Sequence, residues 1–207
     1  TRQYLWDDIL VFKKYLHNNM SVLDIGCGTG RLYQLLQEFQ GVDYVGLDQS
    51  EGQIAMAKQD FPQNNYIVSE MTKLPLMDKR FDFVFCIATL HHLPDENSRK
   101  QALLEMKRLL KSGGYLFMTN WNMNSLTAQK TIAKGKWTKD KFGGYIVPWL
   151  SPEGEKIGER YYYGFNVEKI KNLLETAGFE ILENYYCKKG IESDVKNGAN
   201  IITIAKI

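Results

Sequence analysis

Three glycines spaced two apart follow a short apolar run near the start of the chain, in the segment VLDIGCGTG at residues 22–30. Gly26, Gly28 and Gly30 would let the backbone adopt positive φ angles and let a ligand approach without a Cβ in the way. The acid Asp24 stands just before them. A turn of this kind at the carboxyl end of a strand can hold a phosphate, a dinucleotide or another nucleoside cofactor.

The residues around these glycines separate the three possibilities. A phosphate-binding P-loop needs Lys-Ser or Lys-Thr after its last glycine, and this chain has Arg31-Leu32 there. A dinucleotide-binding turn needs its third glycine five residues after the first, which is also the position of Arg31. Asp48 ends a second apolar run twenty residues after Gly28, where a carboxylate can accept both hydroxyls of a ribose. We therefore expect a nucleoside cofactor that is not a dinucleotide.

The elements that must position this loop are predicted by alternating apolar runs. A capping box from Ser50 to Gln53 starts one helix, and another follows the glycine loop. A helix at 96–111 is expected to end at Gly113-Gly114. Strands are expected at residues 21–25, 44–48, 66–69, 81–88 and 115–120. This alternation is typical of a mostly parallel sheet with helices on both faces.

The two ends of the chain and one internal segment complete the expected domain. Residues 4–17 have the spacing of an amphipathic helix, while residues 181–186 and 201–207 predict an antiparallel pair after a helix at 167–177. Residues 121–164 are rich in lysine, glycine and aromatic residues and show no clean period. We expect one domain over residues 1–207, in which residues 1–18 and the insertion 121–164 form a lid over the cofactor.

The bulk composition excludes several classes of protein. The chain has a net charge of +2 and is 44% hydrophobic, as in an ordinary globular protein without a global preference for polyanions. Its three cysteines are far apart, which argues against a zinc site and for a reducing compartment. No apolar stretch approaches the length of a membrane span, and no signal-peptide pattern is present. We expect a cytoplasmic protein without metal.

The chain resembles the class I S-adenosylmethionine-dependent methyltransferases in stretches that follow the family order: VLDIGCGTG, YVGLDQS, SEMTKLP, FDFVFCIATLHHL and LLEMKRLLKSGGYL. The resemblance implies a single-domain Rossmann-like α/β fold, whose seven-stranded, mostly parallel sheet has an antiparallel last strand. It implies S-adenosylmethionine as methyl donor and S-adenosylhomocysteine as product. Asp24 would orient the methionine amine, and Asp48 would hold the ribose hydroxyls. The other implied donor contacts are Gly26, Gly28, Gly30, Gln49, Glu70, Met71, Ile87 and Ala88.

The methyl acceptor decides whether a general base is needed. A carboxylate is already ionised at neutral pH and needs none, whereas an amine or hydroxyl would need one. His91 and His92 follow the fourth strand, where the methyl group would point. His92 is therefore the candidate catalytic group and His91 a candidate substrate contact. The alternative is that His92 only hydrogen-bonds the backbone ahead of Pro94.

The insertion offers a surface for nucleic acid. Five lysines fall within twelve residues and alternate with aromatic residues: Lys130, Lys134, Lys136, Lys139 and Lys141. Because lysines neutralise phosphates and aromatic rings stack on unpaired bases, this pattern indicates a cap that faces RNA. The alternative is a solvated loop over a hydrophobic lid.

In finer detail the chain resembles the tRNA wobble-uridine methyltransferases, which esterify the carboxymethyl group on carbon 5 of that uridine. The matching residues are Thr1-Arg2, Trp6, His91-His92, Trp121, Val147-Pro148-Trp149 and Arg160-Tyr161-Tyr162. The chain departs from that family at Gly144, Tyr163 and Ile201, where Asp, His and Trp are usual.

This finer resemblance implies tRNA as the partner and a small set of substrate contacts. Arg160 would pair with the substrate carboxylate, and His91, Trp121, Trp149 and Tyr162 would contact the rest of the substrate. Class I members often act with a small activating subunit. The alternative is a small-molecule O-, N- or C-methyltransferase that acts on a planar acceptor.

Overall fold

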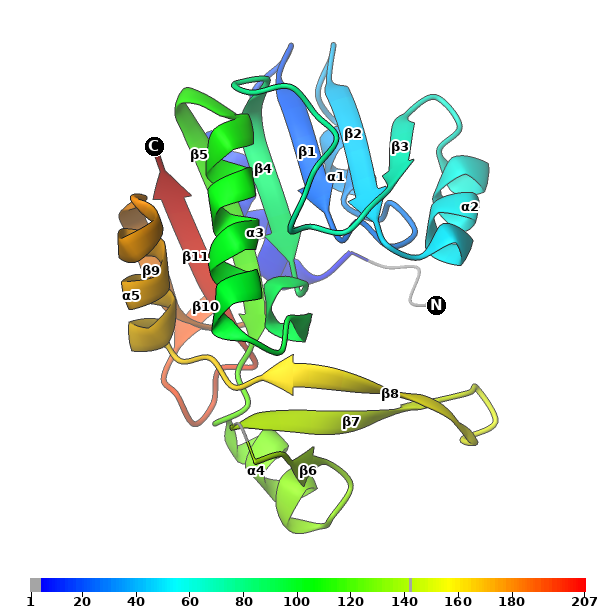
Figure 1. Cartoon of the computed structure of the whole chain (residues 1–207), viewed down its shortest axis with the longest axis vertical. Coiled ribbons are helices and arrows are strands. Elements are labelled where there is room, and N and C mark those ends of the chain that lie inside the picture. The colour runs from blue at the N-terminus through cyan, green and yellow to red at the C-terminus, as the bar shows by residue number, and fades with distance from the viewer. Residues whose placement is uncertain (1–4, 142) are drawn as a thin grey trace.

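A mixed β-sheet forms the centre of the computed structural model, which describes residues 5–141 and 143–207. Over these residues the strand order is β10-β9-β11-β5-β4-β1-β2-β3 (Figure 1). The parallel part comprises β5 (Leu110–Trp121), β4 (Phe81–Ile87), β1 (Ser21–Ile25), β2 (Asp43–Asp48) and β3 (Asn65–Val68). β11 (Asn200–Lys206) is antiparallel to both of its neighbours, β5 and β9 (Glu180–Lys188). The predicted α/β fold with an antiparallel last strand is confirmed.

The sheet has eight strands rather than seven in the described chain. The additional strand is the short β10 (Ile191–Ser193), which pairs with the end of β9 as a hairpin. It lies within the segment that the sequence predicted as a polar loop. Gly190, at φ +77°, makes the tight turn between the two strands, so the chain reverses at once instead of remaining unpaired.

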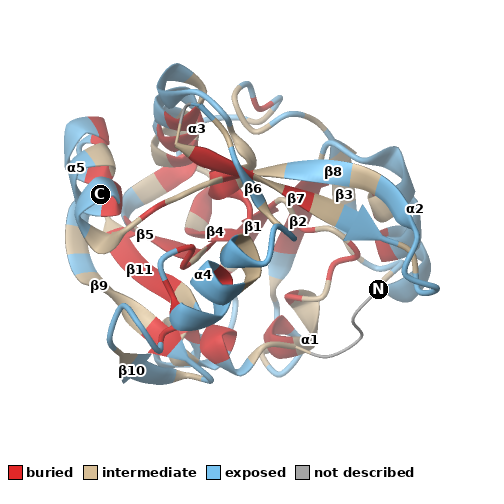
Figure 2. Cartoon of the chain, turned by 90° about the horizontal axis from the view of Figure 1, so that it is seen from below, coloured by how far each residue is buried: buried red, intermediate tan, exposed pale blue. Residues whose placement is uncertain are grey.

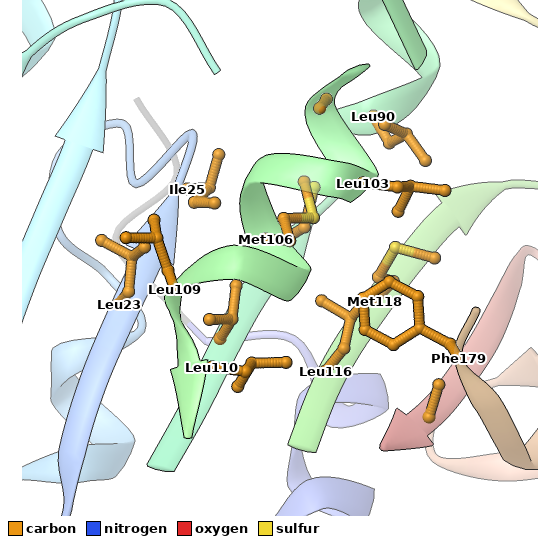
Figure 3. Close-up of a cluster of buried hydrophobic side chains, with 14 of the residues drawn as sticks. Leu23, Ile25, Leu90, Leu103, Met106, Leu109, Leu110, Leu116, Met118 and Phe179 are labelled. Carbon is orange, nitrogen blue, oxygen red and sulfur yellow. The ribbon is translucent and has the colours of Figure 1, made fainter. Parts of the chain in front are cut away.

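Both faces of the sheet are covered, because its strands carry apolar side chains on both sides. One face packs against α3 (Glu96–Leu109) and α5 (Val167–Ala177), and Figure 3 shows Leu103 and Met106 of α3 over this core. The other face packs against η1 (Asp7–Tyr15) and α1 (Tyr33–Leu36). The helix α2 (Glu51–Asp60) lies beside β3 (Figure 1). The helices packed on both faces set the positions at which the strands end. The loops that follow the strands therefore meet at that edge of the sheet.

The N-terminal helix is a 3₁₀ helix rather than the α-helix expected over residues 4–17. Phe12 of η1 is fully buried, and its ring stacks on Phe117 at 4.9 Å and meets Phe85 edge-on at 6.0 Å. Within the described residues, η1 therefore covers a sheet face. The lid role proposed for residues 1–18 stays a prediction, and the predicted substrate motif Thr1-Arg2 lies outside the described residues.

The expected end of the 96–111 helix at Gly113-Gly114 is wrong. α3 ends at Leu109, and β5 begins at Leu110, whose buried side chain belongs to the core below α3. The glycines lie in β5, where the register with β4 shifts between the Phe81–Leu110 and Phe83–Tyr115 pairs. Gly113 has φ +75°, so the pair forms an irregularity inside the strand instead of a helix cap.

The insertion 121–164 forms a small second layer, called here the cap. It contains α4 (Leu126–Ala133) and an antiparallel sheet of β6 (Thr138–Lys139), β7 (Gly144–Leu150) and β8 (Lys156–Tyr163). The long β7–β8 hairpin crosses beyond the carboxyl ends of the parallel strands (Figure 1). Figure 2 shows buried residues concentrated on β5 and β11, whereas β8 and α4 are largely exposed. The cap therefore stands over the edge where β1, β2 and β4 end.

None of the helices formed by the described residues combines the length and the apolar character that crossing a lipid bilayer requires.

Candidate active site

The glycine loop leaves β1 with all three glycines in the left-handed region. Gly26, Gly28 and Gly30 have φ angles of +73°, +55° and +77°. A Cβ at Gly26 would collide with the side chain of Thr89, and a Cβ at Gly30 would lie 2.9 Å from the Tyr66 hydroxyl oxygen. At Gly28 the nearest atom is Gln53 Oε1, at 3.6 Å. Gly26 and Gly30 thus make room for the chain's own side chains, whereas a Cβ at Gly28 would meet no atom closer than 3.6 Å. All three glycines stay predicted donor contacts.

Asp48 binds this loop to the end of β2. Its Oδ2 accepts a hydrogen bond from the Gly28 amide at 2.9 Å, and its Oδ1 accepts one from the Ser50 amide at 2.9 Å. Ser50 in turn caps α2 by accepting from the Gln53 amide at 3.3 Å, as the sequence predicted. Each carboxylate oxygen has two lone-pair sites, so each can still accept a hydroxyl proton. The carboxylate is held half-buried beside Gly28.

Asp24 lies at the end of β1 and is buried. The hydroxyl of Tyr44 donates a hydrogen bond to its Oδ2 at 2.9 Å. Burial raises the pKa of Asp24 to about 7, while the Tyr44 hydrogen bond opposes this rise and the nearby Asp48 charge adds to it. The carboxyl group is thus poised to change charge near neutrality, and a cation bound beside it would favour the ionised form.

The loop after β4 is locked against the glycine loop. Ala88 has φ +52°, a strained conformation for a residue with a Cβ, and its amide donates to both the carbonyl and the hydroxyl oxygen of Thr119 at 3.0 Å. Thr89 donates from its hydroxyl to the Ile87 carbonyl at 2.8 Å and fills the space that Gly26 leaves. Ile87 and Ala88, both predicted donor contacts, are therefore fixed beside the glycine loop.

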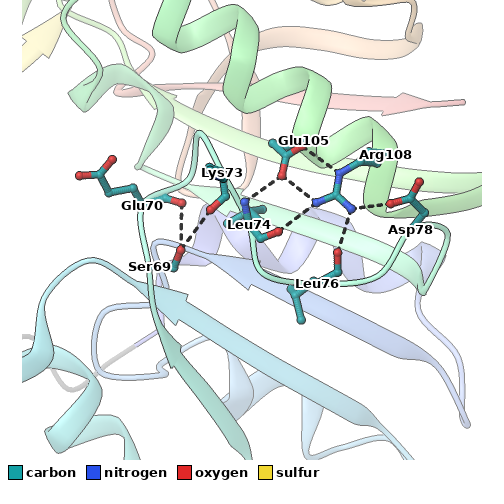
Figure 4. Close-up of polar contacts among 8 residues, drawn as sticks. All are labelled: Ser69, Glu70, Lys73, Leu74, Leu76, Asp78, Glu105 and Arg108. Carbon is teal, nitrogen blue, oxygen red and sulfur yellow. Dashed lines mark hydrogen bonds and ion pairs between the residues drawn. The ribbon is translucent and has the colours of Figure 1, made fainter.

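The third predicted part of the donor site comprises Gln49, which follows β2, and Glu70 and Met71, which follow β3. Gln49 and Glu70 are exposed and Met71 is half-buried. An arginine network anchors the loop that follows (Figure 4): Arg108 of α3 donates to the Leu76 carbonyl at 2.8 Å and the Leu74 carbonyl at 3.1 Å. In Figure 4 the Glu70 carboxylate points away from this network. The anchored loop leaves that carboxylate available to a ligand.

His91 and His92 occupy different environments after β4. His91 is buried, and burial lowers its pKa well below the usual value. His92 is half-buried, and burial also lowers its pKa. Its Nδ1 lies 2.9 Å from the Tyr161 carbonyl oxygen in β8, so the backbone partner is in the cap rather than ahead of Pro94. Both rings are neutral at pH 7, and His92 links the sheet to the cap.

The predicted substrate residues divide into an aromatic stack, buried at His91 and Tyr162 and half-buried at Trp121, and an exposed pair. The Tyr162 ring stacks on His91, at 4.9 Å, and on Trp121, at 4.6 Å, and the last two rings lie 6.1 Å apart. Trp121 also stacks on Trp137 at 6.1 Å. These rings cover one another, so the faces in contact are not available for stacking on a base. Trp149 is 46% exposed.

Arg160 forms the charged half of the exposed pair. The carbon of its guanidinium lies 4.4 Å from the centre of the Trp149 ring, which places the two side chains in cation–π contact. Burial raises the pKa of Tyr162, and the nearby charge of Arg160 opposes this rise. The exposed pair thus borders the aromatic stack at Tyr162. All five cap lysines, Lys130, Lys134, Lys136, Lys139 and Lys141, are exposed as well.

Two departures from the wobble-uridine family pattern have local structural reasons. A Cβ at Gly144 would collide with the ring of Tyr161, so no larger residue fits opposite that ring. Tyr163 packs under the guanidinium of Arg99, whose central carbon lies 3.7 Å from the ring centre. The first change concerns packing within the cap and the second the contact of the cap with α3, so neither involves the exposed pair.

Three residues that sequence reasoning missed complete the site: Tyr44, Thr89 and Thr119. Tyr44 and Thr119 support predicted residues on neighbouring strands, and Thr89 fills the space beside Gly26 in the loop after β1, so no fixed spacing in the sequence marks them. Tyr44 alone carried a signal, as the one polar side chain within the buried run YVGL of β2.

Comparisons with known proteins agree with this geometry. A family model described as "Methyltransferase domain" matches residues 23–118. The tRNA (carboxymethyluridine(34)-5-O)-methyltransferase of Schizosaccharomyces pombe is 31% identical over 204 residues, covering 90% of this chain and 85% of its own. The ubiquinone/menaquinone biosynthesis C-methyltransferase UbiE of Campylobacter jejuni is 26% identical over 88% of this chain and 80% of its own.

The fold has solved counterparts. The crystal structure of a SAM-dependent methyltransferase from Methanosarcina mazei superimposes with a TM-score of 0.76 at 24% identity. The match covers 95% of this chain and 96% of that one.

Proposed function

Because the chain belongs to the class I S-adenosylmethionine-dependent methyltransferases, we propose that it methylates the carboxymethyl group on carbon 5 of the tRNA wobble uridine. The chain is a methyltransferase, and its methyl donor is S-adenosylmethionine. The proposal concerns which acceptor the site takes and which residues hold the two reactants. We keep residues 1–207 as one domain in it, with the cap as the part that meets the acceptor.

The residues present fit the donor. The Gly28 amide binds the Asp48 carboxylate, which has accepting capacity left for the ribose hydroxyls, and the Cβ that Gly28 lacks would meet no atom closer than 3.6 Å. We assign the donor's ammonium to Asp24, its adenine edge to Gln49, Glu70 and Met71, and its methionine chain to Ile87 and Ala88. When bound, the donor supplies an electrophilic methyl group on a sulfonium. The chain then has to align an acceptor with that group and exclude water.

The observation that carries the acceptor assignment is the exposed Arg160–Trp149 pair. A guanidinium pairs with a carboxylate through two parallel hydrogen bonds, and the indole holds it in position. The charge of Arg160 lowers the pKa of His92 and that of Asp48 raises it, so His92 lies within electrostatic reach of both the cap and the donor side. We propose that Arg160 binds the substrate carboxylate and that His92 contacts it.

A carboxylate acceptor also fits the neutral state of the two histidines. It reacts in its ionised form, so the chain need not remove a proton. The aromatic stack of His91, Tyr162 and Trp121 provides a largely apolar surface next to Arg160, which neighbours Tyr162 in β8. The exposed cap lysines neutralise the phosphates of the anticodon loop in this proposal, and the free side of Trp149 contacts an unpaired base.

The relatives support this assignment in part and also give the second candidate. The S. pombe enzyme, whose name states the wobble-uridine reaction, matches along nearly the whole chain. UbiE also matches, at a lower identity. The match to UbiE favours the second candidate, a small planar acceptor enclosed by the aromatic stack. A cytoplasmic location belongs to the proposal as well, since the three cysteines are buried and unbridged.

The test is to incubate the protein with donor labelled in its methyl group and with bulk tRNA, and then to treat the RNA with mild base. Label released as methanol supports a methyl ester. Label that stays on the RNA would show N- or C-methylation, and unlabelled tRNA would exclude the RNA acceptor. The Asp48→Asn variant controls for labelling that does not depend on the donor site.

A further inference from the structure

We propose that Tyr44 is a positioning residue that holds the Asp24 carboxylate ready for the ammonium group of the donor's methionine portion. The inference rests on the proposed assignment of that ammonium to Asp24. It adds the group that orients the Asp24 carboxylate. Tyr44 lies near the start of β2, where it pairs with Val22, and Asp24 lies near the end of β1. The contact therefore joins two neighbouring parallel strands, and the phenol supports Asp24 from within the sheet.

The geometry fixes the phenol. The Tyr44 hydroxyl donates to Asp24 Oδ2 at 2.9 Å, and each of the two residues is only 2% exposed. The Tyr44 ring meets Tyr33 edge-on at 5.3 Å and Tyr66 edge-on at 6.0 Å, and both neighbours restrict its movement. The hydroxyl therefore has little freedom to leave the carboxylate, and the carboxylate has a constant orientation.

The chemistry of the phenol suits this role. A lysine or arginine at this position would neutralise the Asp24 charge and compete with the donor's ammonium. A phenol stabilises the carboxylate by a hydrogen bond and leaves its negative charge uncompensated. Burial keeps the pKa of Tyr44 well above its usual value, so it remains a donor throughout the physiological range. The charge that remains on Asp24 is then available to a cation from the ligand.

The other groups around Asp24 set the direction of its titration. Burial is the main cause that raises its pKa to about 7, the charge of Asp48 adds to the rise, and Tyr44 and Arg31 oppose it. Burial raises the pKa of the Cys27 thiol, and that of Tyr66 to about 12, so both remain neutral. Removing the Tyr44 hydroxyl must raise the Asp24 pKa further. Near pH 7 a smaller fraction of Asp24 would then be ionised, and this loss is reversed as the pH rises.

The test is calorimetric binding of S-adenosylhomocysteine to Tyr44→Phe and to the unaltered protein at two pH values. We expect the variant to bind about tenfold more weakly near pH 7 and within about threefold near pH 9. The ratio of the two proteins is read at each pH, because titration of the ligand's own amine then cancels. Tyr33→Phe is the matched control, since its ring meets Tyr44 edge-on in the same aromatic cluster, and it should bind as the unaltered protein does.

A second probe separates positioning from packing. 5′-Methylthioadenosine lacks the ammonium and carboxylate, so its affinity should be the same for Tyr44→Phe and the unaltered protein. An equal loss for both probes, or a loss that does not depend on pH, would overturn the proposal. Asp24→Asn distinguishes a failure of the Asp24 assignment from a failure of the Tyr44 inference alone. If it binds S-adenosylhomocysteine normally, the Asp24 assignment fails together with the inference. If it loses affinity and Tyr44→Phe does not, only the inference fails.

Discussion

The imidazole of His92 lies 2.9 Å from the carbonyl oxygen of Tyr161 and joins the loop after β4 to the cap. A carbonyl can only accept, so Nδ1 carries the proton and Nε2 is left as an acceptor. Burial is the main cause that lowers the pKa of the ring. His92 is therefore a neutral group that fixes the cap over the end of the sheet, which suits an acceptor that needs no base.

The role of His92 is tested by His92→Asn. The asparagine amide can still donate to Tyr161, but it cannot take up a proton from a substrate. We expect kcat to stay within about tenfold of the unaltered enzyme, because a lost general base costs about 10²- to 10⁴-fold. Single-turnover rates measure this directly, and His92→Ala, which loses the link to the cap, provides the comparison. A fall of kcat by about 10²- to 10⁴-fold in His92→Asn would mean that a base is required.

The glycine loop is tested by two substitutions of the same kind. Gly28→Ala would place its Cβ in ordinary contact with Gln53 Oε1, at 3.6 Å, so it should cost about 1 kcal/mol of unfolding free energy for its positive φ and weaken donor binding at least about tenfold. Gly26→Ala also collides with Thr89 and should cost a further 1–3 kcal/mol, roughly. Denaturant unfolding and calorimetry measure the two effects. Equal donor affinity in Gly28→Ala and the unaltered protein would contradict the assignment of the donor beside Gly28.

The acceptor site is tested at Arg160. Arg160→Gln should raise the KM for tRNA by about tenfold or more, because a charge-assisted hydrogen bond to the carboxylate is lost. Donor affinity should not change. Lys156→Gln removes the same charge from the same strand, where Lys156 pairs with Glu159, and should change the KM by less than about threefold. Equal effects of the two variants would mean that Arg160 contributes only general positive charge.

His91 makes the stability of the protein depend on pH. The folded ring stays neutral, because burial lowers its pKa well below the usual value, whereas the unfolded ring is protonated below about pH 6.5. Stability is therefore lost as the pH falls below that value, by about 1.4 kcal/mol for each pH unit over which only the unfolded ring binds the proton.

His91→Phe keeps a ring against Tyr162 but cannot titrate, so its unfolding free energy should fall less steeply with acid. Chemical denaturation near pH 7 and pH 5 measures both proteins. The opposite contribution of Asp24, whose raised pKa favours the folded state as the pH falls, is common to both and cancels. Parallel losses in the two proteins would contradict this account.

Much of the fold could be predicted from the sequence because its signals are local. The parallel strands follow from apolar runs, α2 from the Ser50 cap, and the end of α5 from Gly178, which has φ +81°. Gly113-Gly114 misled because a glycine pair is equally suited to a helix end and to an irregular strand. The buried Leu110 decided between them through contacts that are distant in the sequence.

The sequence motifs predict donor contacts, which stay predictions, but they do not reveal the residues that support those contacts. Gly26 and Gly30, for example, also make room for Thr89 and Tyr66, which lie far from them in the sequence. Tyr44 supports Asp24 across two strands, and no spacing rule reveals such a pair. The cap strands were missed because their sequence shows no regular apolar period, although β7 and β8 form a long hairpin.

The most direct measurement of the central claim uses a synthetic anticodon stem-loop that carries 5-carboxymethyluridine at the wobble position. The protein and S-adenosylmethionine are added, and the nucleosides are analysed by mass spectrometry before and after mild base. The account predicts that this RNA gains one methyl group, that base removes it, and that the same RNA with unmodified uridine gains none. Methylation of the unmodified RNA, or a methyl group that survives base, would contradict it.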